Sequence, residues 1–447
     1  MSLYLLGERG IMALAKHIDF DVVIVGGGAI GAVLALELDR LNYSVAVVEL
    51  RTPTFASANP ERVVALNDGS RCYLESLGLW QDIEALGLGD IRHIVVTEPG
   101  NRGRFDLHSS DLHSSDLHAS DLQPAVRTDA DDEHALGYVV EMGHLLEPMY
   151  RALQASSVEL IAPACIESFA VLNDQVSIQI RRGDESSTIS SALLVGADGT
   201  NSQIRTMAGI DLFGWDYNRF GLVASVTTEH GHQDTAHECF RSSGPLAFLP
   251  LADGRFSIVW AATPAEATQL LAMDDEAFTY ALKKAAGAST MNKIGAITAV
   301  SKRASFPLEL TIAKSFASSR LTLLGNAAHT IHPVAGQGMN LGFRDVETLI
   351  EVLARAKAQQ GDAYCDPGQS ILMQAYAEKR RGDVMAVAGF TESMSHIFGS
   401  SVPGVKWLRG MGLDNLSRVP ALADLLLQQA SGLAQFNRFK RPEVPHE

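Results

Sequence analysis

One short segment constrains this chain more than any other: residues 21–31, which read DVVIVGGGAIG. The segment has the order of a buried strand, a glycine turn and the start of a helix, and Gly26, Gly28 and Gly31 fit the spacing G-x-G-x-x-G. In such a turn the first glycine permits a tight bend, the second lets a pyrophosphate approach the backbone, and the third lets the helix lie close to the strand. The phosphates then lie at the helix N-terminus, where the helix dipole is positive.

The residues around the glycine turn decide how it is interpreted. A glycine-rich loop by itself often only turns a corner. Here a helix is expected over Ala29–Leu41, and residues 45–49 (VAVVE) predict a second strand that ends in Glu49, 18 residues after Gly31. An acidic side chain at this position is placed to bind a ribose hydroxyl. The combination favours a dinucleotide site over a simple turn.

The composition limits the classes of protein to which the chain can belong. Its 447 residues are 46% apolar and 20% charged, and at about 150 residues per domain they suggest two or three domains. The formal net charge of −16 argues against a nucleic-acid partner, because affinity for a phosphate backbone comes from clustered Lys and Arg. The four cysteines are scattered without a C-x-x-C pair, which gives no support for a zinc site and suits a reducing, cytoplasmic setting. No run of 18 apolar residues predicts a membrane-spanning helix.

Two further landmarks contain strand, turn and helix signals. Residues 193–202 (LLVGADGTNS) predict a strand that runs into a turn at Asp198, after which Ser202 could cap a helix. Residues 321–324 predict another strand that ends at Gly325 and Asn326, and a loop rich in Gly and Pro leads from there to a helix that starts near Met339.

The segments between these landmarks have a different pattern. Residues 219–262 and 295–312 predict strands, and so indicate a mostly β module inserted into the α/β part, while 370–396 and 405–435 predict amphipathic helices. Apolar strand residues could form a wall beside a bound cofactor, although ordinary core is the stronger interpretation for each one taken singly. These residues are Leu246, Phe248, Leu249 and Trp260.

Residues 106–122 repeat Asp-Leu-His with a period of five. His108, His113 and His118 could be considered as metal ligands, but a five-residue spacing gathers them neither on one face of a helix nor on one face of a strand. We therefore predict a polar surface loop here and no metal site.

Three motifs in this order carry a resemblance to a known family: Gly26–Gly31, Gly196–Gly199 and residues 325–340 (GNAAHTIHPVAGQGMN). Together they resemble the single-component FAD-dependent aromatic hydroxylases of the para-hydroxybenzoate hydroxylase type. Within that family, residues 61–66 (ERVVAL), 244–251 (GPLAFLPL) and 301–308 (SKRASFPL) resemble the ubiquinone-biosynthesis hydroxylases, in particular the branch that acts on a 6-methoxyphenol.

The resemblance implies an α/β fold with a Rossmann-like FAD-binding domain, an interleaved, mostly β substrate domain and C-terminal helices. The FAD-binding domain would comprise residues 19–90, 136–210 and 313–395. The substrate domain would comprise residues 91–135, with strands and the repeat loop, and residues 211–312, and a helical segment would follow over 396–447.

The resemblance also assigns the residues that would bind FAD. The first motif and Arg62 would hold the pyrophosphate, Glu49 the adenosine ribose, and Asp198 would lie in the motif that closes over the pyrophosphate. Position 326 would face the ribityl chain or the pyrophosphate. The loop over residues 336–340 would offer backbone N–H groups to the pyrimidine edge of the flavin. The full set of predicted cofactor-binding residues is Gly26, Gly28, Ala29, Ile30, Gly31, Glu49, Arg62, Asp198, Gly325, Asn326, Pro333, Gly336, Gln337, Gly338, Met339 and Asn340.

Two positions depart from the family pattern. Most members have Asp where this chain has Asn326, whose carbonyl oxygen can still accept a hydrogen bond from a hydroxyl but without the added strength of a charge. Some relatives carry an Arg within residues 141–144, where this chain reads EMGH, which weakens the case for cofactor binding there. For His329 and His332 we expect hydrogen bonds that shape the loop rather than a catalytic role.

The activity implied by the resemblance is hydroxylation of a polyprenylated phenol in ubiquinone biosynthesis, with O2 and with electrons from NADH or NADPH, through a C4a-hydroperoxyflavin. Neither a catalytic residue nor a base can be named from the sequence. The alternatives are another phenol as substrate, a flavoprotein reductase or oxidase, and a non-catalytic FAD-binding scaffold of a quinone-synthesis complex. The C-terminal helices could contact such a complex or the surface of the inner membrane, or pack on the FAD-binding domain.

Overall fold

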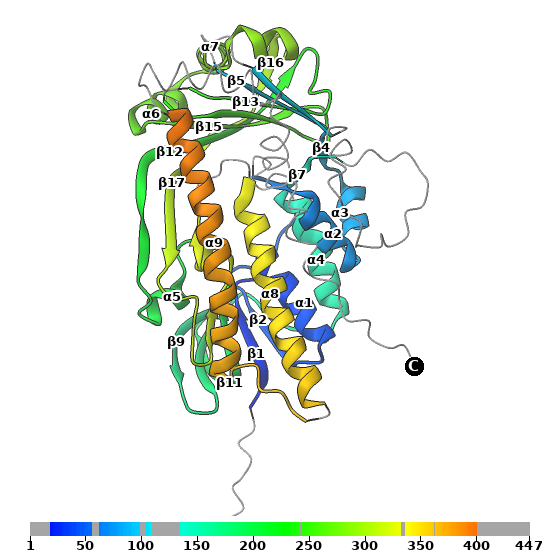
Figure 1. The fold of residues 1–447 in the computed structure, drawn as a ribbon, viewed down its shortest axis with the longest axis vertical. Coiled ribbons are helices and arrows are strands. Elements are labelled where there is room, and N and C mark those ends of the chain that lie inside the picture. Colours follow the sequence, from blue (N-terminus) through cyan, green and yellow to red (C-terminus); the bar gives the residue numbers. More distant parts are fainter. Residues whose placement is uncertain are drawn as a thin grey trace, which may run out of the picture.

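The computed structural model describes residues 18–55, 62–98, 104–109, 135–241, 243–331, 336–361 and 363–399. His332 and Pro333 of the third motif, most of the repeat over 106–122 and the helix expected over 405–435 lie outside these residues. Figure 1 shows that the described chain forms an α/β part at one end and a layer of long strands with short helices at the other.

The glycine turn lies in a mainly parallel sheet. β1 (Phe20–Val25) pairs in parallel with β2 (Val45–Val48) on one side and with β11 (Glu185–Gly196) on the other. The strands β1 and β2 are almost entirely apolar, as expected for strands that are buried on both faces. The sheet is completed by β8 (Glu159–Ile161), β9 (Cys165–Val171), β10 (Val176–Arg182), β18 (Ala317–Ser318) and β19 (Leu321–Leu323).

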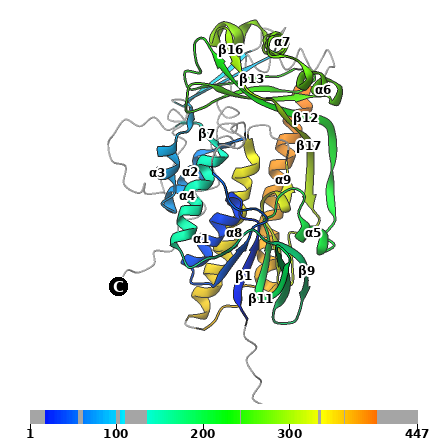
Figure 2. The ribbon, with the colours of Figure 1, turned by 180° about the vertical axis from the view of Figure 1, so that it is seen from behind.

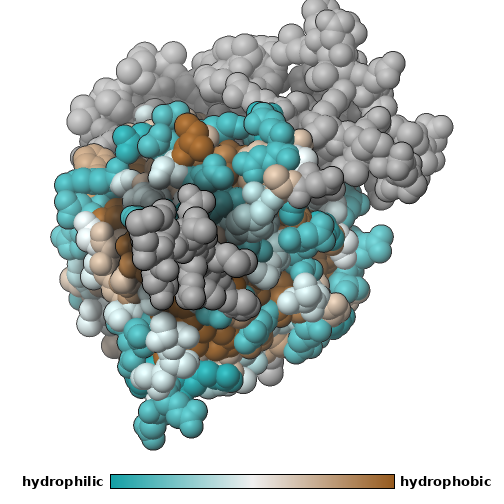
Figure 3. Space-filling model, turned by 90° about the horizontal axis from the view of Figure 1, so that it is seen from below, coloured by the Kyte–Doolittle hydropathy of each residue, from teal (hydrophilic) through white to brown (hydrophobic). Residues whose placement is uncertain are grey.

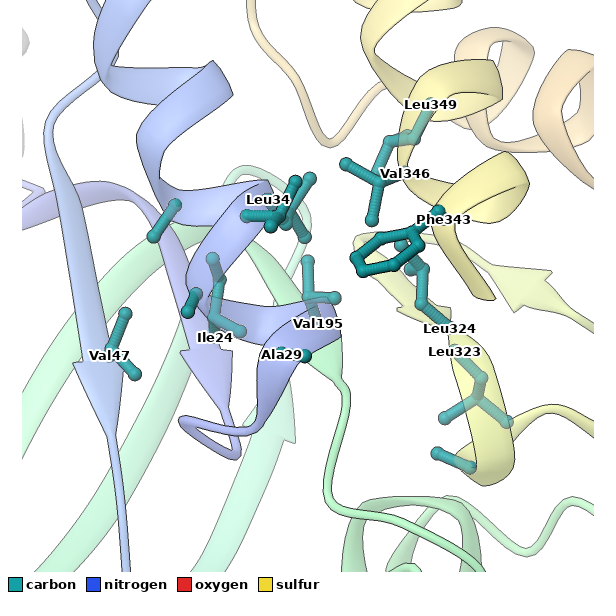
Figure 4. Close-up of a cluster of buried hydrophobic side chains, with 14 of the residues drawn as sticks. Ile24, Ala29, Leu34, Val47, Val195, Leu323, Leu324, Phe343, Val346 and Leu349 are labelled. Atoms are coloured by element: carbon teal, nitrogen blue, oxygen red, sulfur yellow. The ribbon is translucent and has the colours of Figure 1, made fainter. Parts of the chain in front are cut away.

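Long helices cover this sheet, and their apolar faces form its main core. Figure 4 shows Ile24 of β1 and Leu34 of the first helix close to Val195 of β11, with Phe343 and Val346 of a later helix beside them. These five side chains are at most 1% exposed, and burial of a side chain of this size contributes roughly 1.5–3 kcal/mol. The helices are α1 (Ala29–Arg40), α4 (Met142–Ala155), α8 (Gln337–Gln360) and α9 (Ser370–Gly399).

The described residues of the inserted module form a second, largely antiparallel sheet of nine strands. Its longest strand is β12 (Leu212–Thr228), which pairs with β17 (Ala304–Ala313) and β15 (Phe256–Ala262). The other strands are β5 (His93–Thr97), β6 (Arg104–His108), β13 (Thr235–Cys239), β14 (Leu246–Pro250), β16 (Ile297–Val300) and β20 (His329–Thr330).

Two helices that the sequence pattern did not predict cover the outer face of this sheet. They are α6 (Pro264–Ala272) and α7 (Asp275–Ile294), and Figures 1 and 2 show them on the side away from the α/β part. Leu246, Phe248 and Trp260 pack beneath them, in one cluster with Phe278 of α7. The suggested apolar wall beside the cofactor was therefore wrong for these three residues, because their strands present them to the opposite face.

A small third sheet connects the two parts. It consists of β3 (Val63–Leu66), β7 (Gly137–Glu141) and β4 (Gly89–Ile91), in the order β3-β7-β4. Val139 and Ile91 pack with Ala236, Phe240 and Leu251 of the module in an apolar cluster. Short helices follow in this region and at the other two motifs. They are α2 (Asp68–Ser76) and α3 (Trp80–Leu86) near the third sheet, α5 (Gln203–Met207) after the second motif, and the 3-10 helix η2 (Gly325–Ala327) at the start of the third motif.

The elements predicted at the landmarks are confirmed to within a few residues. The first helix ends at Arg40, the second strand at Val48, and the helix predicted from Met339 begins two residues earlier, at Gln337.

Figure 3 shows the surface at the end of the molecule that is lowest in Figure 1. Among the described residues, the rim of this face is mostly hydrophilic, and hydrophobic residues are grouped inside the rim. Within the described ranges, no helix combines the length and apolar character needed to cross a membrane.

Candidate functional site

The glycine turn leaves open space beside the N-terminus of α1. A Cβ on Gly31 would lie 1.9 Å from the carbonyl oxygen of Gly26, and one on Gly26, whose φ is +106°, would lie 2.4 Å from that of Ala197. These two positions therefore require glycine for the fold itself. At Gly28, by contrast, a Cβ would meet nothing within 4 Å, and Gly28 forms the N-cap of α1 without a side-chain cap. This uncapped helix end is suited to bind an anion.

Glu49 fixes the shape of the turn. Its Oε2 accepts a hydrogen bond from the backbone N–H of Gly27 at 2.7 Å, and its Oε1 accepts one from that of Arg51 at 3.1 Å. On the other side the hydroxyl of Tyr150, on α4, donates to the carbonyl of Gly27 at 2.6 Å. Burial, and then the nearby charge of Glu49, raise the pKa of Tyr150, so its hydroxyl remains a donor.

The carboxylate of Asp198 makes its hydrogen bonds to residues of the second motif and of the helix that follows it. This carboxylate accepts hydrogen bonds from the backbone N–H groups of Gln203 at 2.7 Å and Ile204 at 3.2 Å, and from the hydroxyl of Ser202. Ser202 caps α5, as predicted, by accepting a hydrogen bond from the N–H of Arg205 at 3.0 Å. In the structure Asp198 therefore shapes the turn, and a direct contact between Asp198 and FAD stays a prediction.

The second and third motifs lie side by side. The guanidinium of Arg205 donates to the carbonyls of Thr200 at 2.8 Å and Ala327 at 2.9 Å, and so joins α5 to η2. The hydroxyl of Thr200 accepts from the amide nitrogen of Asn326 and the hydroxyl of Thr330, both at 3.2 Å. Asn326 is exposed, and no described group donates to its Oδ1, which leaves that acceptor available to a ligand.

A buried cluster of Asp345, His329 and Arg380 fixes the conformation of the third motif. Asp345 accepts hydrogen bonds from the N–H of Gly325 and from Nε2 of His329, both at 2.7 Å, and from Nε of Arg380 at 2.6 Å. Burial opposes ionisation of Asp345, but the neighbouring charges of His329 and Arg380 outweigh it and hold the pKa of the carboxyl below its ordinary value. His329 therefore makes the loop-shaping hydrogen bond predicted for it.

Asn340 fixes the N-terminus of α8. Its Oδ1 accepts from the N–H of Asn67 at 3.0 Å and the hydroxyl of Ser70 at 2.7 Å, and its Nδ2 donates to the carbonyls of Ala65 at 3.1 Å and Gly336 at 3.0 Å. All four hydrogen bonds are internal, so the side chain serves the loop rather than a ligand. The N-cap, Gly336, has φ +63° and no side-chain cap. The space around Gly338 is open, Gln337 is buried and Met339 is half-buried.

Direct contacts join the first and third motifs. A Cβ on Gly325 would lie 3.3 Å from Cγ1 of Ile30, and one on Gly342 would lie 2.7 Å from its Cδ1, so Ile30 packs against both. Figure 1 shows that α1 and α8 run side by side and both begin near the middle of the molecule. The structure thus gathers all three motifs around two helix N-termini that no side chain caps.

Two predicted positions are less closely tied to this group. Arg62 lies directly before β3 with an exposed side chain, and its carbonyl accepts a hydrogen bond from the N–H of Met142. In the EMGH segment, His144 bonds through Nδ1 to the carbonyl of Gly87 at 2.9 Å, which places it at the end of α3. The part of the chain that the structure describes contains no group of three or more His, Cys, Asp or Glu residues arranged to hold a metal.

The arrangement fits an elongated dinucleotide. The uncapped end of α1 offers N–H groups and open space to a pyrophosphate, and Asn326 offers a free acceptor to a hydroxyl-bearing chain next to it. The uncapped end of α8 offers further N–H donors on the same side of the sheet. The donor set therefore matches the predicted binding of FAD, although the individual roles remain predictions.

Comparison with known proteins yields one family. The family described as FAD binding domain matches residues 19–391. The chain is 31% identical over 419 residues to the 3-demethoxyubiquinol 3-hydroxylase of Escherichia coli (strain K12), which covers 92% of this chain and 98% of that protein. It is also 31% identical over 434 residues to ubiquinone hydroxylase UbiL of Rhodospirillum rubrum, with 95% and 91% covered.

The solved structures support the predicted fold class. The p-nitrophenol 4-monooxygenase PnpA of Pseudomonas putida DLL-E4 superimposes with a TM-score of 0.72 at 17% identity, over 93% of this chain and 98% of that chain. At this identity the likeness concerns the fold alone. It confirms an α/β, Rossmann-like FAD-binding fold with a β-rich second part.

Proposed function

Since the chain belongs to the FAD binding domain family and is a flavoprotein hydroxylase, we propose that it hydroxylates a polyprenylated phenol in ubiquinone biosynthesis. The names of two relatives that match almost the whole chain support this substrate class. The structural observation that carries the proposal is the meeting of the three motifs at the uncapped N-termini of α1 and α8.

In this proposal, FAD supplies the activation of O2 when it is bound, with electrons from NADH or NADPH. The residues of the chain bind and orient it. The turn at Gly28 holds the pyrophosphate, Glu49 holds the turn in shape and reaches the ribose, and Asn326 accepts from the hydroxyl-bearing chain. The inner face of the second sheet excludes water from the reacting ring.

The position of hydroxylation is the finer part of the proposal. The sequence resemblance favours the branch that acts on a 6-methoxyphenol, whereas one relative is named for hydroxylation at position 3 of a demethoxyubiquinol. Both substrates are electron-rich phenols with a polyprenyl chain, so one site could accept either ring. We propose the 6-methoxyphenol as substrate and treat the demethoxyubiquinol as the competing outcome of the test.

A cofactor measurement and a genetic measurement test the proposal. The purified protein should carry a flavin that absorbs at about 450 nm, because the chromophore belongs to the cofactor. A strain that lacks the gene should accumulate a quinone precursor, and the hydroxyl absent from that precursor, identified by mass spectrometry, gives the step. A normal quinone pool in the deletion strain would contradict the proposal.

The rival functions predict different results. A reductase or oxidase would consume NAD(P)H without placing oxygen on a phenol, and a scaffold would restore the quinone pool even with its FAD site destroyed. Complementation of the deletion strain with a variant that cannot bind FAD separates the scaffold from the enzyme. We further propose that the protein works in the cytoplasm, in contact with a quinone-biosynthesis complex or the inner-membrane surface, where its substrate lies.

A further inference from the structure

Glu238 lies on the inner face of the second sheet. Its neighbours along β13 point the other way: Sγ of Cys239 lies 3.3 Å from the hydroxyl of Thr290 on α7, and the ring of His237 lies 6.1 Å from that of Phe256, in the cluster beneath α6 and α7. Successive residues of a strand point to opposite faces. Glu238 therefore points away from these helices, toward the side on which the FAD-binding part lies (Figure 1).

The surroundings of Glu238 connect it to the third motif. Ala236 and Phe240 share its face and pack with Val139 of β7. Val139 pairs with Ala65 of β3, and the carbonyl of Ala65 accepts the hydrogen bond from Nδ2 of Asn340 at the N-terminus of α8. A short series of contacts thus leads from the strand that carries Glu238 to the helix end that would hold the flavin.

The carboxyl group of Glu238 is not used in the hydrogen bonds and ion pairs of the described residues. Within the described ranges it has neither a hydrogen-bond nor an ion-pair partner, although carboxyls in apolar surroundings are usually paired. Val96 and Ala247 lie directly across from it on the adjacent strands. Glu238 as a whole is half-buried.

Burial alone raises the pKa of Glu238 to about 7. No neighbouring charge is among the causes of this shift. Of the elements packed against β13, β14 has no titratable side chain and α7 lies on the other face of the sheet. The titratable or charged groups on or near β4, β5 and the end of β13 are Asp90, Arg92, His93, Glu98 and Arg241. A carboxyl with a pKa near neutrality is suited to take up and release a proton at working pH.

We propose that Glu238 is the catalytic base that accepts the proton of the substrate's phenolic hydroxyl. In this step the phenol O–H bond breaks, a new O–H bond forms on the carboxylate, and no electron is transferred. The resulting phenolate is a more electron-rich ring than the phenol and therefore reacts faster with an electrophilic oxygen. The inference rests on the proposed function, because it requires a phenol as substrate.

The test uses the FAD-loaded enzyme, a 2-methoxyphenol with one short prenyl chain, and a fluorinated analogue of that phenol that ionises at lower pH. For the wild type, kcat/KM on the first phenol should rise about tenfold for each pH unit below 7 and level off above it. Glu238→Gln should lose roughly 100-fold or more at pH 8 and lose the rise with pH. On the fluorinated phenol the loss should shrink at least tenfold, because that substrate needs no base.

Glu238→Asp and a control complete the design. Glu238→Asp keeps a carboxylate and should retain the pH-dependent rise at a lower rate, while Glu276→Gln, an exposed residue at the start of α7, should match the wild type. Equal losses of Glu238→Gln on both phenols, or an unchanged pH profile, would overturn the role of Glu238 and leave the proposed function standing. A wild-type enzyme that binds FAD but hydroxylates no phenol would overturn both.

Discussion

Nε2 of His329 lies 2.7 Å from Oδ2 of Asp345, and both side chains are 1% exposed. The same carboxylate oxygen accepts the backbone N–H of Gly325, and the other oxygen accepts Nε of Arg380. One buried carboxylate on α8 thus joins the turn before Asn326, the loop after it and α9. The conformation of the third motif therefore depends on a group that a ligand in the site would not touch.

Replacing Asp345 should weaken both the fold and the retention of FAD. Asp345→Asn removes one of the two carboxylates that pair with the buried Arg380, the other being Asp383. Breaking a buried pair costs about 3–5 kcal/mol, and the remaining partner should hold the loss at or below the lower end of that range. Urea unfolding of the apoprotein measures this loss, and flavin fluorescence after dilution measures retention. A variant with wild-type stability and wild-type FAD retention would contradict the role given to Asp345.

The sign of the pH dependence follows from the lowered pKa of Asp345. A carboxyl whose pKa in the folded protein is below its ordinary 3.8 contributes stability above that ordinary value and loses it as the pH falls toward the folded pKa. The free energy of unfolding of the wild type should therefore decrease in acid. In Asp345→Asn this part of the decrease should be absent, so the two unfolding curves should converge as the pH falls below 4 (an approximate limit set by that ordinary pKa).

Gly28 can be tested without disturbing the fold. Its backbone is extended, with φ −66° and ψ 178°, and a Cβ would meet no protein atom within 4 Å. Gly28→Ala should therefore fold with nearly unchanged stability but bind FAD at least tenfold more weakly, because the methyl group occupies the space assigned to the pyrophosphate. Equilibrium titration of the apoprotein with FAD gives the affinity.

Two other glycines serve as controls for that experiment. Gly382→Ala, in open space on α9, should bind FAD like the wild type and be stabilised by about 0.5–1 kcal/mol. Gly31→Ala should fail to fold normally, because its Cβ would lie 1.9 Å from the carbonyl oxygen of Gly26. Wild-type FAD affinity in Gly28→Ala would show that the pyrophosphate lies elsewhere.

Asn326 allows a test of a single acceptor atom. Asn326→Leu removes the Oδ1 acceptor and the contact with Thr200, and should bind FAD several-fold more weakly, whereas Asn326→Asp keeps an acceptor and should bind at least as well. Because Asn326 is exposed, neither change should alter the stability of the apoprotein by more than about 0.5 kcal/mol. Equal FAD affinities in the two variants would remove Asn326 from the site.

The sequence was most informative where function depends on local geometry. The spacing of Gly26, Gly28 and Gly31 predicts a strand, a turn and a helix, and at Gly31 the steric reason is local, because a Cβ there would lie 1.9 Å from the carbonyl oxygen of Gly26. Glu49 was marked by its position, since it directly follows the next strand of the sheet, which ends at Val48. Ser202 as a helix cap is a third case, with its partner three residues away.

The remaining parts of the site depend on contacts between distant segments. Tyr150 bonds to Gly27 across 123 residues, and Arg205 to Ala327 across 122, and neither residue stands in a local pattern that marks it. Asp345 and Arg380 offered a weak signal, as charged residues among the apolar positions of their helices. Strand alternation separated Leu246 from Ala247 but could not say which face would meet α6 and α7, so the apolar wall was assigned to the wrong side.

The raised pKa of Glu238 also predicts a stability effect that needs no substrate. The ordinary pKa of this carboxyl is 4.5 and its folded value is about 7, so the folded protein holds the proton more tightly than the unfolded chain does. Stability from this group is complete below pH 4.5 and is lost as the pH rises through 7.

Glu238→Gln lacks this titration, so its free energy of unfolding relative to that of the wild type should increase between pH 5 and pH 8 by roughly 1–3 kcal/mol. Chemical denaturation of both apoproteins at the two pH values measures this difference, with Glu276→Gln expected to show none. A difference that does not change with pH would mean that Glu238 ionises as freely in the folded protein as in the unfolded chain, and would remove the low-dielectric setting on which its assignment as a base depends.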